Sequence, residues 1–533
     1  MDIKEEYEEH ASALTADKDE VKEETVSNIQ LQEATCNLAH RGAPKDSFDK
    51  LTEVSKEGGD IEYETVGNLS SDHKNMTFIS KTAEFVRSNL ESTEAEEIAE
   101  AIYACVERIM CDVVKEEPRF RSSDIIKVGS FYEGTKILEP NEFDFLVVID
   151  ELSKPGAVSV VTEDIRPGYA EVLLIDDSLK QRWKHTDENC VLHNFQDYEH
   201  ASSFGFVVLS TLAKLAEKQS LKYELQEVGY IYLPDTLISF PPTGNFSLEL
   251  EYAEVWNPNV MLKFQCDKMT ISVDISPAIR YHKVTDCFNP EDCIAEQLAE
   301  AVLNRGSILL VNSLDMLDKD PAHEHVFRIT FTETEVQYVK CMEHGHKNIY
   351  VFMKYLTHVF KNNLKCQYKY HEDSKIELPS YLLKLACIFH DVQCSLPPSV
   401  YLNICLFKIL LIFINWYQSG HYKSVFNTKL LVCKKSDMIV HRHRKMLDFL
   451  VDFCIHKVEA PDITQANFNP RPFLESKLRE FYNSKYVSLE NTRRKLLLPL
   501  AYCAVESLSN PEEVIRKVSS KTHRPSVLSF FSE

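Results

Sequence analysis

Two neighbouring segments decide the fold: Val128-Gly-Ser-Phe-Tyr-Glu-Gly134 and, after a short connection, Asn141-Glu-Phe-Asp-Phe-Leu-Val-Val-Ile149. In the second segment apolar residues recur at every other position, which predicts a β-strand. Glu142 and Asp144 are two positions apart on this strand, so both carboxylates leave the same face. Gly129 and Ser130 precede it at a turn, where a glycine lets the backbone approach a phosphate and a serine hydroxyl can bond its oxygen.

A third acid fits the same pattern further along the chain. In the segment Thr270–Ser276, alternate residues are apolar and predict a buried face, while Asp274 belongs to the opposite face. Adjacent carboxylates repel one another unless a cation lies between them, and Mg²⁺ or Mn²⁺ prefers oxygen ligands. Three such acids on neighbouring strands can hold two divalent ions for phosphoryl transfer. The alternative interpretation makes Glu142, Asp144 and Asp274 ordinary charges on a surface strand.

The chain of 533 residues divides by pattern into four parts. Residues 1–72 are acidic and poor in aromatics, which is typical of a disordered tail. Residues 73–330 mix helical and strand periods, residues 331–445 are helical, and residues 446–533 form a helical C-terminal extension. We therefore predict an α+β protein with a mixed sheet followed by an all-helical part.

The expected elements follow from the periodicity of the apolar residues. From Met76 onwards one long helix, or two helices joined near Ser92, is expected. Further strands are expected at 170–175, 229–233, 246–252, 260–265 and 269–275. Further helices are expected at 334–342, 347–361, 378–391, 401–418, 444–457 and 473–519.

Composition narrows the class of protein. The formal charge of −23 excludes a general polyanion binder, so a nucleic acid would need a local basic face. The acidic N-terminus lacks the features of a signal peptide, and the most apolar run, 402–417, is too short to span a bilayer. The cysteines are scattered among apolar neighbours and are expected to be reduced thiols. These observations predict a cytoplasmic protein without a membrane span.

The Gly-Ser turn, the Glu-x-Asp strand and the later single acid resemble the cyclic GMP-AMP synthase-like receptors of the male-abnormal-21 superfamily. The resemblance covers about residues 75–430. It implies a bilobal fold in which 73–330 is a polymerase-β-type nucleotidyltransferase core and 331–445 is a helical lobe. It also implies that ATP and GTP are joined into a cyclic dinucleotide, most simply cyclic GMP-AMP, in innate immune sensing.

The resemblance also implies nucleotide contacts in the second half of the chain. Arg328 would contact the guanine base, and an Arg fork does suit guanine O6 and N7. The other implied contacts are Thr330, Thr332, Glu335, Lys354, Ser380, Tyr381 and Lys384. The alternative interpretations are structural: Thr332 and Glu335 could form a helix capping box, and Ser380 could cap a helix that carries a solvated Lys384.

One departure from the family concerns zinc. The DNA-sensing synthase has a zinc-binding thumb at the position of residues 336–353, where only Cys341, His344 and His346 remain. Three candidate ligands without a fourth argue against zinc there, and a polar turn between helices is the simpler interpretation. Loss of the thumb argues against sensing of double-stranded DNA.

Double-stranded RNA is the expected activator, through Lys and Arg residues of 361–445, although these could also be ordinary solvated helix faces. The basic residues are Lys361, Lys365, Lys369, Lys375, Lys423, Lys429, Lys434, Lys435, Arg442, Arg444 and Lys445. Two alternative functions remain open: a catalytically silent nucleotide-binding or nucleic-acid-binding relative, and a non-cyclising transferase of the oligoadenylate type. Oligomeric state and phosphodiester linkage have no signal in the sequence.

Overall fold

The computed structural model describes residues 66–183, 203–312, 326–367, 380–434 and 468–483, apart from short interruptions within these ranges. Residues 1–65, the expected helix at 444–457 and the end of the chain beyond 483 lie outside the described residues. Within the described part of the chain, no helix is long and apolar enough to cross a membrane.

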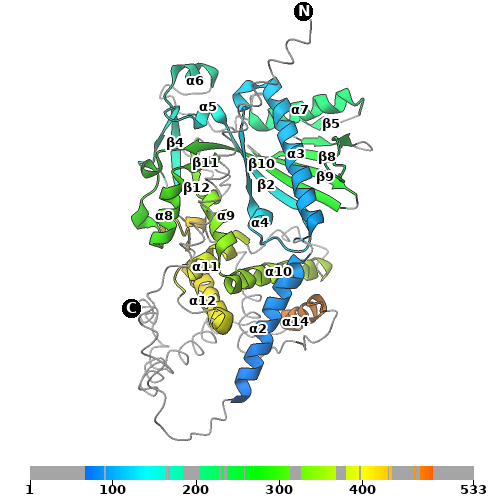
Figure 1. Ribbon diagram of the computed structural model, residues 1–533, viewed down its shortest axis with the longest axis vertical. Helices are drawn as coiled ribbons and strands as arrows, with labels where there is room; N and C mark the ends of the chain where they lie inside the picture. Colours follow the sequence, from blue (N-terminus) through cyan, green and yellow to red (C-terminus); the bar gives the residue numbers. More distant parts are fainter. Residues whose placement is uncertain are drawn as a thin grey trace, which may run out of the picture.

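A twelve-stranded sheet dominates the first half of the chain (Figure 1). Its main path is β3-β4-β12-β11-β10-β9-β8-β6-β5; β2 pairs with β10 and β1, and β7 pairs with β8. The strands are β1 Asp124–Val128, β2 Glu142–Val148, β3 Val158–Val161, β4 Tyr169–Leu174, β5 Glu224–Gln226, β6 Tyr230–Tyr232, β7 Ile238–Ser239, β8 Glu249–Trp256, β9 Asn259–Cys266, β10 Met269–Tyr281, β11 Ile308–Asn312 and β12 Phe327–Thr330. With its helices this sheet makes the fold α+β, which confirms that prediction.

The sheet is antiparallel except where β2 runs parallel to β10. The predicted alternation on β10 is confirmed: Ile271, Val273 and Ile275 are fully buried, whereas Asp274 is accessible to solvent. On β2 the burial pattern is similar, because Phe143 and Phe145 are buried while Glu142 is exposed. Both strands therefore present their acids on the face that is not packed into the core.

Helices surround the sheet and form a separate group below it in Figure 1. Their bounds are α2 Val66–Arg87, α3 Thr93–Glu116, α4 Gly129–Tyr132, α5 Asp150–Ser153, α6 Asp177–Arg182, α7 Phe204–Lys218, α8 Glu296–Arg305, α9 Thr332–Cys341, α10 His344–Gln367, α11 Ser380–Asp391, α12 Pro398–Ser419 and α14 Arg471–Asn483. A two-stranded hairpin, β13 His421–Lys423 and β14 Leu431–Lys434, follows α12.

Helices α2 and α3 are separate and meet near Ser92, which confirms the second of the two predicted alternatives, two helices rather than one long helix. Ser92 caps α3, with its side chain accepting a hydrogen bond from the backbone N–H of Ala95. Helix α2 begins at Val66, inside the segment predicted as a disordered tail. That start was not predicted because the residues before Met76 are mostly polar and lack a helical apolar period.

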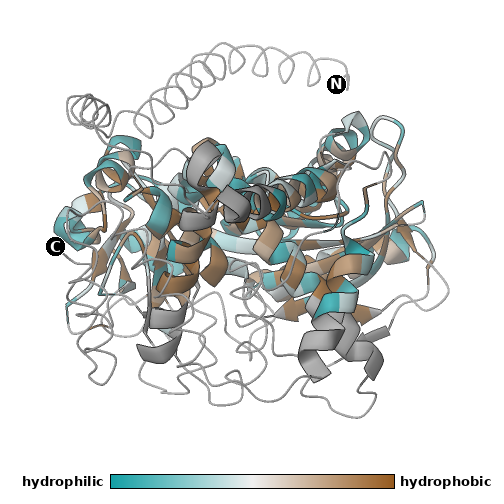
Figure 2. Cartoon of the chain, turned by 90° about the horizontal axis from the view of Figure 1, so that it is seen from below, coloured by the Kyte–Doolittle hydropathy of each residue, from teal (hydrophilic) through white to brown (hydrophobic). Residues whose placement is uncertain are grey.

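The group below the sheet, which we call the helical part, consists of α2, α10, α11, α12 and α14. Helix α2 packs against α10, and the Arg87 side chain donates a hydrogen bond to Asn348 over 2.8 Å. The apolar run in α12 is a buried core helix, as expected, with Cys405, Ile409 and Phe413 fully buried. One cluster of buried apolar residues continues from the sheet into these helices, and Figure 2 shows the hydrophobic segments concentrated in the middle of the molecule.

Candidate functional site

The three predicted acids meet at one edge of the β2–β10 pair. In the parallel register Asp144 lies directly opposite Asp274, and Glu142 lies opposite Ser272. Because the side chains of both residues in a register pair leave the same face, the Asp144 and Asp274 carboxylates are neighbours, with Glu142 one pleat away. The structure thus brings together the acids that the sequence singled out.

Gly129 supports this cluster from the neighbouring strand. Strand β1 pairs with β2 so that Val128 lies opposite Asp144, and Gly129 follows directly with φ of +82°. A Cβ atom at Gly129 would lie 1.8 Å from Oδ2 of Asp144. Glycine is therefore required at this position for two reasons: the backbone is left-handed, and the Asp144 carboxylate fills the space where a Cβ atom would lie.

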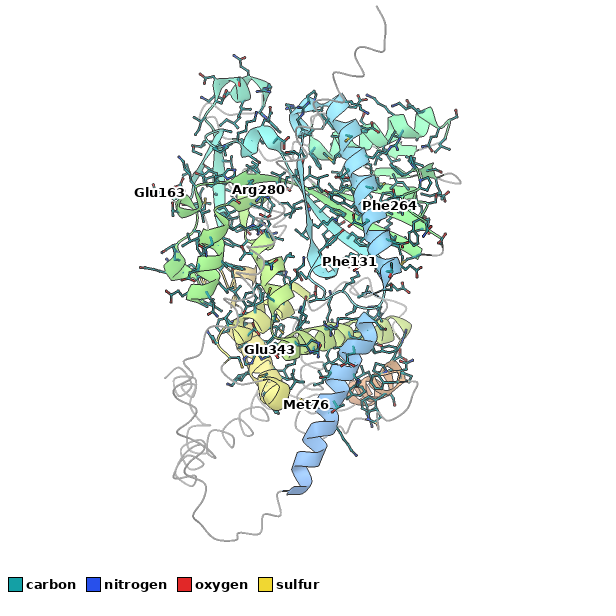
Figure 3. The ribbon with its side chains drawn as sticks, in the orientation of Figure 1. Met76, Phe131, Glu163, Phe264, Arg280 and Glu343 are labelled. Carbon is teal, nitrogen blue, oxygen red and sulfur yellow. The ribbon has the colours of Figure 1, made fainter. Side chains whose placement is uncertain are left out.

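The turn after Gly129 is closed by its own backbone. The Ser130 carbonyl accepts hydrogen bonds from the N–H groups of Thr135 and Lys136, over 2.9 and 2.8 Å. Below the turn, the ring of Phe131 packs on Phe143, with centroids 4.8 Å apart, and Figure 3 shows Phe131 between the sheet and α10. These contacts hold the start of α4 in place, with Gly129 against Asp144 and Ser130 directly after it.

The two aspartates, Asp144 and Asp274, have raised pKa values and hold their protons more tightly than free carboxyl groups do. Desolvation, together with the charges of Glu142 and Asp274, raises the pKa of Asp144 to about 7. Desolvation by the surrounding protein, together with Glu142, raises the pKa of Asp274 to about 6, although this side chain is accessible to solvent. A cation bound between these carboxylates would stabilise their ionised forms and lower both pKa values.

Two lysines approach the same acids. The Lys136 ammonium forms an ion pair with Glu142, with Nζ 2.5 Å from Oε2, so a metal ion at Glu142 has to displace it. Lys354 of α10 donates a hydrogen bond to the Thr135 carbonyl over 3.4 Å. Burial, together with the charge of Lys136, lowers the pKa of Lys354 to about 8. A phosphate beside Lys354 would raise this pKa again and so favour the protonated, positively charged form of the lysine.

The binding of Mn²⁺ is expected to weaken as the pH falls. A divalent ion binds the ionised carboxylates, and the raised pKa values of Asp144 and Asp274 mean that protons compete between about pH 5 and about pH 7. Calorimetric titration should show affinity falling at least about tenfold from about pH 8 to about pH 5.5.

Without metal, the same pKa values affect stability in the opposite direction: the folded state becomes less stable as the pH rises. The folded state then binds more protons than the unfolded chain, so stability should fall as the pH rises from about 4 to about 7. The Asp144→Asn variant should lose most of this slope and most of the Mn²⁺ binding. A Mn²⁺ affinity that does not change with pH would contradict the assignment of these acids as ligands.

Lys384 lies in a buried ionic cluster at the junction of α11 with the turn. Its Nζ is 2.8 Å from Glu133 and 3.0 Å from Glu335, and all three side chains are buried. Although desolvation alone would lower it, Glu335 and Glu133 hold the pKa of Lys384 well above its usual value. In this arrangement the Lys384 charge is already neutralised by protein carboxylates rather than directed to a phosphate.

The other residues implied on α11 surround this cluster. The Tyr381 hydroxyl donates a hydrogen bond to Glu335 over 3.0 Å, and Lys384 lies 4.9 Å from the centre of the Tyr381 ring. Ser380 is the first residue of α11 and is exposed. Ser380 and Lys384 both lie in the first turns of α11. The alternative interpretation, in which Lys384 is solvated, is wrong because Lys384 is buried.

Replacing Lys384 by methionine is expected to destabilise the protein strongly. Two buried carboxylates would remain without their cation, which costs about 3–5 kcal/mol of unfolding free energy. The matched control is Lys127→Met, which breaks a solvent-accessible pair with Glu100 and should cost less than about 1 kcal/mol. Urea unfolding measures both, and neutralising Glu133 and Glu335 by glutamine should restore part of the loss; equal effects of the two lysine variants would contradict the role of the cluster.

Strand β12 carries the residues implied for the guanine base. Arg328 is exposed and Thr330 lies on the same side of the strand, whereas Phe327 and Ile329 are buried. The Thr330 and Thr332 hydroxyls are 2.5 Å apart, and Arg328 lies within electrostatic range of the Tyr381 hydroxyl. The alternative interpretation, a capping box, is wrong: Thr332 is the first residue of α9 after Phe331, and Glu335 is engaged by Lys384 instead.

Several predicted features are placed elsewhere or lie outside the described residues. On the expected basic surface, Lys429 pairs with Asp292 over 2.8 Å. The other basic side chains of that surface lie outside the described residues, including those of Lys361, Lys365, Lys423 and Lys434. Cys341 is disulfide-bonded, so the prediction that every cysteine is a thiol is wrong at this position.

Glu133 and Lys136 were missed by the sequence interpretation. Both directly follow the Gly-Ser turn, and their charges in an otherwise apolar and small-residue segment were the available signal. Their partners, Lys384 and Glu142, could not be identified from spacing. Compared with models of known protein families, the chain matches none.

Proposed function

We propose that this protein is a metal-dependent nucleotidyltransferase that joins ATP and GTP into a cyclic dinucleotide, most simply cyclic GMP-AMP. The observation that carries the proposal is the set of three carboxylates on β2 and β10, with Asp144 directly opposite Asp274 and Gly129 packed against it. Phosphoryl transfer at two metal ions needs several carboxylates close together, and adjacent strands can supply them.

The donor set fits two Mg²⁺ or Mn²⁺ ions. Glu142, Asp144 and Asp274 offer only oxygen atoms, and burial together with the neighbouring carboxylates raises the pKa values of both aspartates, which a bound cation would reverse. Bound ions of this class would neutralise the α-phosphate and lower the pKa of the attacking ribose hydroxyl. We assign Asp274, the acid on β10 opposite Asp144, to accept the proton of that hydroxyl.

The neighbouring residues would hold the nucleotides. Gly129 and Ser130 are fixed beside the acids and can approach a triphosphate, and Lys354 supplies a cation from α10. Arg328 and Thr330 share an accessible face of β12 and would contact the guanine base. For Lys384 and Tyr381 to bind nucleotide, the contacts with Glu133 and Glu335 must first open.

Double-stranded RNA is the proposed activator. In the present arrangement Lys136 forms an ion pair with Glu142. Lys384 forms ion pairs with Glu133 and Glu335, so these acids and lysines neutralise one another. A conformational change that separates these pairs would free the acids for metal and the lysines for phosphate. Binding of a polyanion to Lys and Arg residues of 361–445 is the proposed cause of that change.

The proposal is tested by incubating the full chain with all four labelled nucleotides, Mg²⁺ or Mn²⁺, and double-stranded RNA, double-stranded DNA or neither. A cyclic product that contains adenine and guanine, formed only with metal and stimulated by RNA, is the expected result. Linear oligoadenylate would favour the non-cyclising alternative. Nucleotide binding without any product under all conditions would favour a catalytically silent protein and reject the enzyme.

A further inference from the structure

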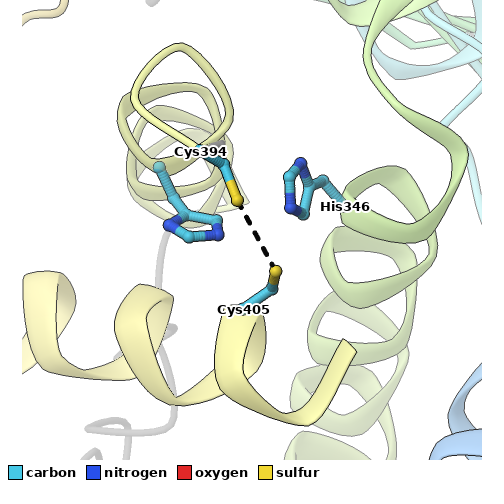
Figure 4. Close-up of side chains that lie close together, drawn as sticks. His346, Cys394 and Cys405 are labelled. Carbon is cyan, nitrogen blue, oxygen red and sulfur yellow. Dashed lines mark hydrogen bonds between the residues drawn. The ribbon is translucent and has the colours of Figure 1, made fainter. Parts of the chain in front are cut away.

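A second group of possible metal ligands lies inside the helical part, away from the carboxylates. It consists of His346 of α10, His390 in the last turn of α11, Cys394 just after α11, and Cys405 of α12. One donor atom from each of these residues lies within 4.8 Å of all the others. Figure 4 shows Cys394, Cys405 and His346 directed toward a common centre from the segment after α11, from α12 and from α10.

The distance between the two sulfur atoms fits shared coordination. The Sγ atoms of Cys394 and Cys405 are 3.8 Å apart, and neither residue is in a disulfide. A disulfide would bring them to about 2.05 Å. Two thiolates on one tetrahedral zinc, each with a Zn–S bond of about 2.3 Å, are separated by about 3.8 Å.

The two imidazoles each have a nitrogen that needs a ligand. Nε2 of His346 and Nε2 of His390 are both buried without a hydrogen-bond partner. The rings are 4.7 Å apart and nearly perpendicular. A buried polar nitrogen without a partner is costly, and a metal ion between the rings would satisfy both at once.

Residues around the cluster orient one of these rings. Nδ1 of His346 lies 2.5 Å from Oδ1 of Asp391, and Asp391 also accepts a hydrogen bond from the Tyr338 hydroxyl over 2.5 Å. A proton on Nδ1 shared with the carboxylate leaves the lone pair of Nε2 facing the cluster. The arrangement of carboxylate, histidine and metal is the usual second-shell support of zinc ligands.

We propose that His346, His390, Cys394 and Cys405 bind one structural zinc ion. A donor set of two thiolates and two imidazoles favours zinc over oxygen-seeking ions such as Mg²⁺. Since all four positions are taken by protein and three of the four side chains are buried, the ion would have no open position for catalysis. The turn with Cys341 and His344 is not this site, because only His346 from that segment takes part.

The zinc would fix the relative positions of α10, α11 and α12, which pack against one another. His346 precedes Lys354 on α10 by about 12 Å of helix, and Lys384 precedes His390 on α11 by less than two turns. The ion would therefore hold together the two helices that carry these lysines. The zinc site itself is independent of the proposed nucleotidyltransferase activity.

The first test is the metal content of the full-length protein, purified under reducing conditions without chelator. Mass spectrometry of the metal should find about one zinc per chain. Cobalt(II) exchanged into the site should give the visible spectrum of a tetrahedral ion with thiolate ligands. A strong chelator should lower the melting temperature, and zinc but not Mg²⁺ should restore it.

Variants locate the ion. Cys394→Ser and Cys405→Ser should reduce zinc to less than about a tenth of an ion per chain. The matched control is Cys387→Ser, which alters a buried cysteine within α11, outside the cluster, and should retain zinc. Asp144→Asn with Asp274→Asn should also retain it, which separates this site from the carboxylates.

The inference can be rejected on the unmodified protein, even if a cysteine variant fails to fold. Wild-type protein that contains no zinc, takes up none when it is supplied, and gives no tetrahedral cobalt spectrum would overturn it. Peptide mapping that finds Cys394 and Cys405 joined by a disulfide in reduced, zinc-supplemented protein would overturn it as well.

Discussion

Neutralising the two opposed aspartates, by Asp144→Asn with Asp274→Asn, is expected to reduce product formation at least about a thousandfold. The variant removes two of the three oxygen donors but keeps the size of each side chain and the Lys136–Glu142 ion pair. The fold should survive, because neutralisation removes the repulsion and desolvation that raise both pKa values. Thermal unfolding without metal at about pH 8 should therefore give a melting temperature equal to or above that of the wild type.

The matched control is Glu139→Gln, an exposed acid on the connection before β2 that is outside the cluster. It should keep wild-type activity and Mn²⁺ affinity. Radiolabelled product formation and calorimetric Mn²⁺ titration separate the two variants. Full turnover by the double variant would show that the β2–β10 edge is not the active site.

Replacing Gly129 by alanine should also cause a large loss of activity, for a different reason. The added Cβ would overlap the Asp144 carboxylate, and the backbone φ of +82° already disfavours any side chain. Either the turn or the carboxylate must move, and both belong to the proposed metal and phosphate site. We expect activity and Mn²⁺ affinity to fall at least about a hundredfold, since a displacement of about 1 Å is enough for such a loss.

Gly134 provides a control with the same backbone strain and no clash. It lies five residues away with φ of +70°, and a Cβ atom there would meet nothing within 4 Å. Gly134→Ala should cost about 1–2 kcal/mol of stability and leave Mn²⁺ affinity within about twofold of the wild type. Equal losses of Mn²⁺ affinity in both variants would mean that strain in the turn, rather than contact with Asp144, explains the glycine.

The local parts of the candidate site could be predicted from the sequence. Alternation of apolar residues placed Glu142 and Asp144 on one face of a strand and Asp274 on the polar face of another, and the structure has these faces as predicted. The helices α10, α11 and α12 were also predicted, because their apolar residues recur at the helical period. The short strands β1 and β11 and the helix α7 were not predicted, since their apolar runs do not distinguish strand from helix.

The charge pairs of the site had no such signal. Lys384 and Ser380 share a helix face, but the sequence gives no indication that Glu133 and Glu335 neutralise this lysine. The zinc ligands show the same limit: His390 and Cys394 are four residues apart, a spacing compatible with a metal, yet His346 and Cys405 come from two other helices. The three ligand candidates chosen by proximity in the sequence included only one member of the cluster.

The amino-acid sequence by itself therefore determined the two strands that carry the acids, the faces from which the acids project, and the helices α10, α11 and α12, because these patterns repeat over a few residues. Only the tertiary structure decided that β2 lies parallel to β10 with Asp144 opposite Asp274, that Gly129 abuts Asp144, and that three helices bring two histidines and two cysteines together. The physical reason is that the periodicity of a segment specifies its buried face but not its partner. The partner is chosen by how the apolar faces of all the segments pack into one core.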